Sequence, residues 1–170
     1  ITYGDWSSDV CSSDLVAQAG LFINNPYVLT PTERTSAEAV AVLQHLITQL
    51  QSRFYCCSPP EHDRAVAWIS HLPVMVSASL IRACLQESNP DVLNLAHQLA
   101  SSGFRDTSRV GGGVPELGRL MAEYNTAALL RSLATYRQQL DTVIEAIEGQ
   151  HWSALEAYLE ETEKARSDFV

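Results

Sequence analysis

Length, composition and charge bound what this chain can do. Its 170 residues are 46% hydrophobic and 18% charged and carry a formal net charge of −9, which is typical of one soluble domain with a fragment of another. The acidic balance argues against nucleic acid and anionic membranes as partners. We expect no apolar run to cross a bilayer, because serines and Arg82 interrupt the stretch from Val74 to Cys84.

The first 15 residues do not read like part of a folded domain. Residues 5–15 (DWSSDVCSSDL) look like a sequencing adapter translated in frame, and they are mostly serine and aspartate with no apolar period. They also lack the basic start and apolar centre of a signal peptide. We therefore expect residues 1–15 to be a disordered artefact, with the protein's own sequence beginning near Val16.

The next segment is predicted to form one strand–helix–strand unit. Residues 27–30 favour a short strand, a helix over about 36–50 is capped by Thr35 or Ser36, and residues 53–57 favour a second strand. A single crossover of this kind cannot build a parallel sheet that is covered on both faces. The unit therefore looks like the end of a larger α/β domain.

Everything after the Ser-Pro-Pro segment at 58–60 is predicted to be helical. The apolar spacing and the Gly and Pro positions indicate four helices, at about 61–86, 91–101, 115–148 and 152–166. The third is long, and apolar residues nearly encircle it, which favours either pairing with a second copy or a central place in a monomeric bundle. Small residues that would permit close helix approach are Ser77, Ala78, Ser79 and Ala83.

Arginines beside a glycine run suggest a carboxylate site. Arg105 and Arg109 are four residues apart, Asp106 lies between them, and three glycines follow at 111–113. A guanidinium can bind both oxygens of a carboxylate. The alternative for Arg109 and Asp106 is a surface ion pair on a helix, and Arg105 could instead bond helix-end carbonyls.

Two histidines mark the start of the helical segment. His62 precedes Asp63, and His71 precedes Leu72 and Pro73. Nine residues along one helix place the two imidazoles on roughly opposite faces, so we predict no shared metal site unless Pro73 distorts the turn. His62 and Asp63 could instead support the helix start, and His71 could be a core residue.

A histidine–aspartate pair in a helical protein is also found in metal-dependent phosphohydrolases. Candidate ligands under that alternative are His45, His62, Asp63 and either Asp91 or Asp106. The spacing of a fourth ligand is unconvincing. A non-catalytic helical interaction module is a second alternative, and it leaves Arg109 without a role.

The segments at 61–73 and 101–117 together resemble the C-terminal part of the prephenate/arogenate dehydrogenase family. The stretch Phe104-Arg-Asp-Thr-Ser-Arg109 is similar to the family pattern FRDxTR. The resemblance implies that Arg109 binds the substrate carboxylate, with Asp106 and Arg105 supporting it. It also implies that His62 and Asp63 lie at the entrance to the site, and that the helical part is a dimerisation domain.

The resemblance gives a fold class and a domain division. We expect a mainly α chain in which a truncated βαβ remnant of a Rossmann-type nucleotide-binding domain, 16–58, precedes a helical dimerisation and substrate-binding domain, 59–170. Two positions depart from the prephenate-specific pattern: Val74 replaces a histidine, and Gly118 replaces a tryptophan. These departures resemble the arogenate-preferring branch that uses NADP.

The parts needed for catalysis are expected outside this sequence. It contains no GxGxxG turn after a strand, and the family's catalytic histidine would lie upstream of Val16. We therefore expect NADP, or NAD, to bind the full-length protein and not this fragment, which should be inactive alone. The four cysteines show no CxxC metal spacing and no disulfide framework, which fits a reducing cytoplasm.

Overall fold

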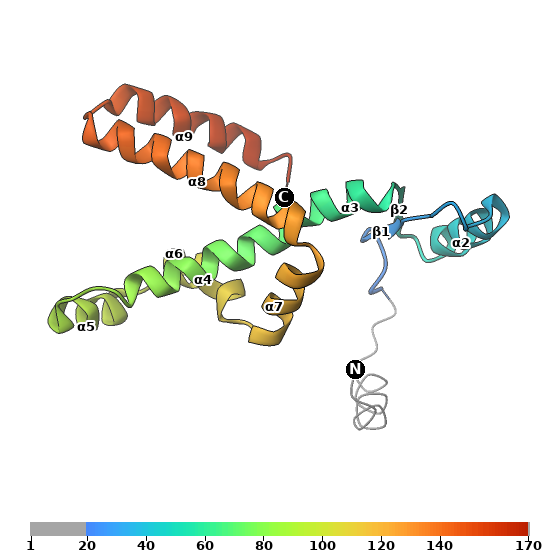
Figure 1. Ribbon diagram of the computed structural model, residues 1–170, viewed down its shortest axis with the longest axis horizontal. Helices are drawn as coiled ribbons and strands as arrows, with labels where there is room; N and C mark the ends of the chain where they lie inside the picture. The colour runs from blue at the N-terminus through green and yellow to red at the C-terminus, as the bar shows by residue number, and fades with distance from the viewer. Residues whose placement is uncertain (1–19, 170) are drawn as a thin grey trace, which may run out of the picture. The chain divides into compact units, whose positions relative to one another are not determined.

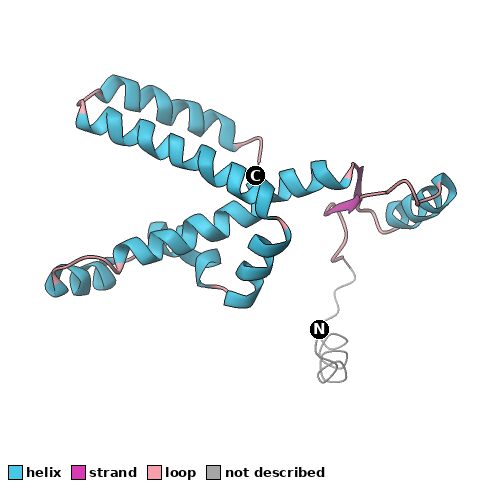
Figure 2. Ribbon diagram, viewed as in Figure 1, coloured by secondary structure: helices cyan, strands magenta, loops and turns pink. Residues whose placement is uncertain are grey.

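The computed structural model describes residues 20–169, so the predicted artefact at 1–15 lies outside the described residues. The chain divides between His62 and Asp63 into two compact units. Figure 2 shows that helices dominate and that the strands are confined to a small sheet. The predicted fold class, a small α/β segment followed by a helical domain, is confirmed.

The first unit contains the predicted strand–helix–strand crossover. Strands β1 (Pro26–Leu29) and β2 (Arg53–Cys56) flank helix α2 (Ala37–Gln49) in the sequence. They pair in parallel, with Pro26 opposite Arg53 and Leu29 opposite Cys56. Ser36 caps α2, because its Oγ accepts a hydrogen bond from the Ala39 N–H at 3.1 Å.

The first predicted helix of the second segment is continuous but changes its winding. It consists of α3 (Pro59–Val66), a π-helical segment η1 (Ala67–His71) and α4 (Leu72–Cys84). In η1 the Leu72 N–H bonds the carbonyl of Ala67, five residues back. Pro73 follows at once, and a proline ring clashes with the carbonyl four residues earlier in a regular α-helix. The wider turn of η1 accommodates the proline without ending the helix.

This continuity corrects the expectation about apolar runs. Within the described residues, the helical run Pro59–Cys84 spans 26 residues and contains an 18-residue window with a mean hydropathy of 1.3, which is long and apolar enough to cross a membrane by length and composition. The expectation counted the serines and Arg82 as interruptions of a short stretch, whereas the apolar residues on both sides of Pro73 belong to one helix. Core helices of soluble proteins pass the same test, so the run by itself is weak evidence for a membrane span.

Shorter helices follow the long run. Helix α5 (Pro90–Leu99) begins at a cap formed by Asn89, whose Oδ1 accepts from the Asp91 N–H at 2.9 Å. Helix α6 (Ser102–Ser108) then leads directly into a 3₁₀ turn, η2 (Arg109–Gly112). Arg109 therefore opens a tighter turn and lies just outside the α-helix that contains Arg105.

The predicted helix at 115–148 is wrong, because it is two helices. Helix α7 (Pro115–Tyr124) ends and α8 (Thr126–Glu148) begins on either side of Asn125, whose backbone leaves the helical region with φ −129° and ψ 36°. The Asn125 side-chain amide donates to the carbonyl of Asp63 at 2.7 Å and lies 3.2 Å from Nδ1 of His71. These long-range contacts hold the break.

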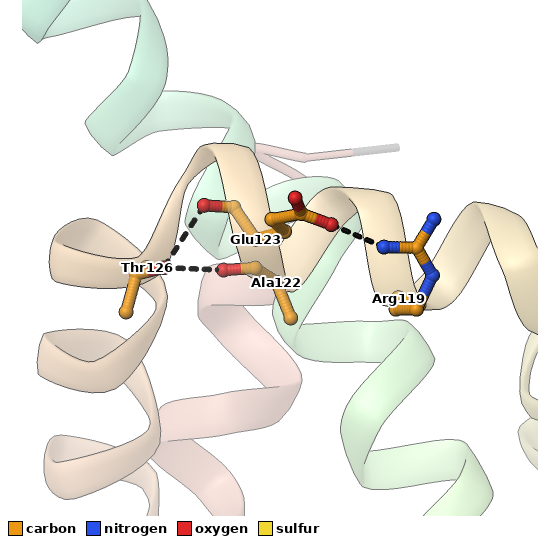
Figure 3. Close-up of polar contacts among 4 residues, drawn as sticks. All are labelled: Arg119, Ala122, Glu123 and Thr126. Carbon is orange, nitrogen blue, oxygen red and sulfur yellow. Dashed lines mark hydrogen bonds and ion pairs between the residues drawn. The ribbon is translucent and has the colours of Figure 1, made fainter.

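The local contacts at this junction are drawn in Figure 3. The Thr126 hydroxyl donates to the carbonyls of Ala122 and Glu123, at 2.6 and 3.1 Å, which satisfies the end of α7. Arg119 pairs with Glu123 one turn later on the same helix. At this junction the chain turns from α7 into α8, and the carbonyls of Ala122 and Glu123 are hydrogen-bonded.

The last helix and the core complete the second unit. Helix α9 (Trp152–Arg166) returns alongside α8 (Figure 1). Among the described residues of the second unit, the buried apolar side chains are those of Ala67, Leu72 and Leu129, and the serines Ser77 and Ser132 are buried with them. This small core lies where η1 and α4 meet α8, so long apolar faces elsewhere stay exposed.

Candidate functional site

Arg109 stands at the corner between α6 and the glycine turn. It is exposed, and none of the ion pairs among residues 20–169 involves it. Asp106 instead pairs with Arg105, with Nε and Oδ1 3.2 Å apart and both side chains largely exposed. Asp106 thus pairs with Arg105 and not with Arg109, and the hydrogen bond made by Arg105 goes to Asp106.

The turn that begins at Arg109 is packed tightly onto α4. The Gly111 N–H donates to Oγ of Ser77 at 2.8 Å, and Ser77 is only 2% exposed. A Cβ on Gly111 would lie 2.3 Å from the backbone nitrogen of Ala78, so only glycine fits there. The small residues of α4 were expected to permit the close approach of another helix, and in the structure it is the turn containing Gly111 that approaches them.

The two positions predicted to set specificity meet in the structure. A Cβ on Gly118, in α7, would lie 3.7 Å from Cγ1 of Val74 and 4.0 Å from Cε of Met75. These are ordinary van der Waals distances, so a larger side chain at 118 would pack over 74 and 75. Residues 74–78 of α4 therefore contact both the Arg109 turn and α7.

The histidine–aspartate pair lies just inside α3, and it does not cap the helix. Ser58 and Glu61 form the cap instead: the Ser58 N–H and hydroxyl both reach Oε2 of Glu61, at 2.9 and 2.7 Å. His62 is half-buried and Asp63 is exposed. The backbone carbonyl of Asp63 receives the Asn125 amide, which ties the start of the second unit to the α7–α8 corner.

The metal-site alternative finds no support in this geometry. Among residues 20–169, no three His, Cys, Asp or Glu side chains are grouped so that they could hold a metal ion. The ligand set proposed for a phosphohydrolase, His45, His62, Asp63 and Asp91 or Asp106, is therefore not assembled.

An apolar groove of about 830 Å³ runs between α4, α6 and α8. It lies on the side of α4 that presents Val76, Leu80 and Ala83, and Leu130 and Leu140 of α8 form its opposite wall. Both leucines are exposed, by 61% and 44%. An open apolar surface of this kind is typical of an interface with another helix face.

Three residues of this region escaped the sequence analysis. Ser77 was noted only for its size, Met75 was not noted, and Asn125 was absorbed into a long helix. Asparagine in the middle of a helical pattern is itself a signal, because its side chain competes for backbone groups. No comparable signal marks Met75 or the hydroxyl of Ser77.

Comparison with known proteins gives a consistent family. The model of the family described as prephenate dehydrogenase, dimerization domain, matches residues 58–161. Prephenate dehydrogenase of Bacillus subtilis is 31% identical over 134 residues, covering 79% of this chain and 36% of that protein. Cyclohexadienyl dehydrogenase of Zymomonas mobilis is 30% identical over 148 residues, covering 87% of this chain and 50% of that protein.

Solved structures agree with the sequence relatives. The crystal structure of Synechocystis arogenate dehydrogenase superimposes with a TM-score of 0.85 and 57% identity, over 89% of this chain and 54% of that one. Prephenate dehydrogenase from A. aeolicus, in complex with hydroxyphenyl propionate and NAD+, has a TM-score of 0.80 at 22% identity over 89% of this chain and 52% of that one, and so shares the fold. The chain spans about half the length of these relatives or less.

Proposed function

This chain belongs to the prephenate dehydrogenase family, and on that premise we propose that residues 59–170 are the substrate-binding and dimerisation domain of an arogenate or prephenate dehydrogenase. The whole enzyme would oxidatively decarboxylate its substrate in tyrosine biosynthesis. The observation that carries the proposal is the position of Arg109 on a turn packed against residues 74–78, the stretch of α4 that also meets Gly118.

Arg109 is the proposed anchor for the substrate carboxylate. Its guanidinium is exposed and not engaged in an ion pair with any residue of the described chain, 20–169. The planar guanidinium of arginine can donate two parallel hydrogen bonds to a carboxylate, which the ammonium group of a lysine cannot do. His62 and Asp63 are proposed to lie at the entrance, and Arg105 with Asp106 to shape the surface charge beside Arg109.

Arogenate is the preferred substrate in this proposal. Prephenate carries a keto acid side chain, whereas arogenate carries an ammonium group there. Val74 offers no donor and no positive charge, and Gly118 adds no side chain over it, so nothing at this wall repels an ammonium. The 57% identity with Synechocystis arogenate dehydrogenase supports the same choice.

The cofactor is proposed to be NADP or NAD, the latter being bound to the A. aeolicus relative. The described residues do not fit a dinucleotide: their glycine run, Gly111 to Gly113, follows a helix, and no glycine lies between β1 and α2. A nicotinamide would supply the hydride acceptor from residues other than these. We accordingly expect the 170 residues alone to be inactive.

Dimerisation is proposed to cover the apolar groove between α4 and α8. Leu130, Leu140 and their neighbours would be buried by the helices of a second copy. The cysteines of the described segment, Cys56, Cys57 and Cys84, are all free thiols, which fits the proposed cytoplasmic location. The net charge of −9 continues to argue against nucleic acid.

The carboxylate role is tested with Arg109→Ala in the complete enzyme. If bound substrate shields Arg109 from water in the complete enzyme, loss of the charge-assisted pair should raise KM on the order of 100-fold, about 3 kcal/mol, and leave the dissociation constant of NADP unchanged. Arg109→Lys should recover only part of the loss, because an ammonium keeps the charge without the fork. A KM within twofold of the parent for Arg109→Ala would contradict the assignment.

The substrate preference is tested with Val74→His in the same enzyme. An imidazole at this position can donate to a keto acid but opposes an ammonium when it is protonated. We expect the ratio of kcat/KM for prephenate over arogenate to rise by about tenfold, which is ~1.4 kcal/mol. Val74→Leu serves as the control for size, and an equal shift in that variant would refute the polar explanation.

A further inference from the structure

The contact between Gly111 and α4 is the tightest backbone approach that the glycines of residues 20–169 make. The Gly111 N–H donates to Ser77 Oγ at 2.8 Å, across 34 residues of sequence. A Cβ on Gly111 would stand 2.3 Å from Ala78 N, 2.4 Å from the carbonyl carbon of Ser77 and 2.7 Å from its Oγ. Two of these three are backbone atoms, which cannot rotate away.

Burial makes the Ser77 hydroxyl a fixed partner. Ser77 is 2% exposed, so water cannot replace it as the acceptor for Gly111, and an unpaired amide there would be costly. By contrast, the neighbouring Gly112 has no atom within 4 Å of a Cβ position. Within this turn, Gly111 is therefore in close contact with α4, whereas the Cβ position of Gly112 has free space around it.

Arg109 lies two residues before Gly111, the residue that contacts α4. It is the first residue of the 3₁₀ turn that contains Gly111, and its backbone is helical, with φ −54° and ψ −48°. Asp106 is paired with Arg105, and no other ion pair of the described residues reaches Arg109. The backbone of the turn therefore sets where the Arg109 side chain begins, and no ion pair of the described residues orients it further.

We infer that Ser77 and Gly111 are positioning residues for Arg109. Their hydrogen bond and close contact fix the turn on α4, and Arg109, the proposed anchor of the substrate carboxylate, is the first residue of that turn. This inference rests on the proposed function of Arg109. It assigns a specific role to a buried serine that the family resemblance did not identify.

The test is a double-mutant cycle in the complete enzyme. Ser77→Ala removes the acceptor without adding bulk, and it should raise KM for arogenate by five- to tenfold while kcat stays within twofold. In an Arg109→Ala background the same change should have no further effect on KM, because Ser77 acts only through Arg109. Ser132→Ala is the matched control, since Ser132 is 1% exposed but bonds only its own helix, at the carbonyl of Leu129.

A second measurement does not depend on substrate. Amide hydrogen exchange at Gly111 should be slow in the parent and at least tenfold faster in Ser77→Ala, with exchange in α8 unchanged. Ser77→Ala with an unaltered KM, or effects of Ser77→Ala and Arg109→Ala that multiply, would overturn the inference and leave the carboxylate role of Arg109 intact. An unaltered KM in Arg109→Ala would instead overturn the proposed function.

Discussion

The two units of the chain differ in how they bury their apolar side chains. In the first, Ile47 of α2 is the buried apolar residue among the described ones, and its neighbours Leu43, Leu46 and Leu50 are 44–51% exposed. In the second, Ala67, Leu72 and Leu129 are buried together where three helical segments meet. In the first unit the apolar face of α2 is largely exposed, whereas the second unit has a small buried core and further apolar side chains that stay exposed.

The difference follows from the geometry of the elements. A parallel pair of four-residue strands and one helix can cover only one face of the sheet. Helices cross at points, and small residues such as Ser77 and Gly111 let the backbones approach closely at one of them. The exposed apolar surface of the first unit is therefore expected to need more of an α/β domain, and that of the second to need a second copy.

The largest expected effect is a loss of stability when the close contact between the Gly111 turn and α4 is disrupted. Gly111→Ala places a methyl group 2.3 Å from a backbone nitrogen of α4, and should lower the free energy of unfolding by about 3 kcal/mol. The melting midpoint should fall by roughly 6–12 °C in thermal denaturation. Gly112→Ala, where a Cβ meets nothing within 4 Å, should stay within ~0.5 kcal/mol of the parent. Equal midpoints for the two variants would contradict this description of the crossing.

Much of this architecture could be predicted from the sequence, because its causes are local. The Ser36 cap, the parallel crossover and the bounds of α9 follow from short-range patterns of apolar, capping and turn residues. The proximity of Val74 and Gly118 was not predicted as a contact, yet both positions were singled out from the family pattern.

The parts that could not be predicted depend on contacts between distant residues. Asn125 divides the expected long helix because its amide reaches Asp63 and His71, which are 62 and 54 residues away. The sequence predicted one helix through Pro73, but the wider turn by which the chain accommodates this proline depends on packing around η1. Asp106 has two arginines within a turn, and sequence spacing alone could not tell which one it would pair with.

The next expected effect concerns the exposed leucines of the two units. Leu130→Glu puts a charge into the groove between α4 and α8, and should raise the dimer dissociation constant at least tenfold, because burying an unpaired carboxylate is unfavourable. Sedimentation at micromolar concentration measures the change. Leu46→Glu, on α2 with a similar 51% exposure, should leave dimerisation unaltered. Loss of the dimer in both variants would mean that the first unit also belongs to the interface.

The smallest expected effect is confined to the first unit and tests whether the units are energetically separate. Ser36→Ala removes the hydroxyl that accepts the Ala39 N–H at 3.1 Å, which should destabilise α2 by about 1 kcal/mol. Amide hydrogen exchange should then quicken roughly fivefold in α2 and stay unchanged in α8, since each 1.4 kcal/mol is tenfold. Ser36→Asp keeps a capping acceptor and adds a favourable charge at the helix start, so it should match the parent or exceed it. If Ser36→Ala also accelerated exchange in α8, the two units would unfold as one, and their different burial would not reflect separate stability.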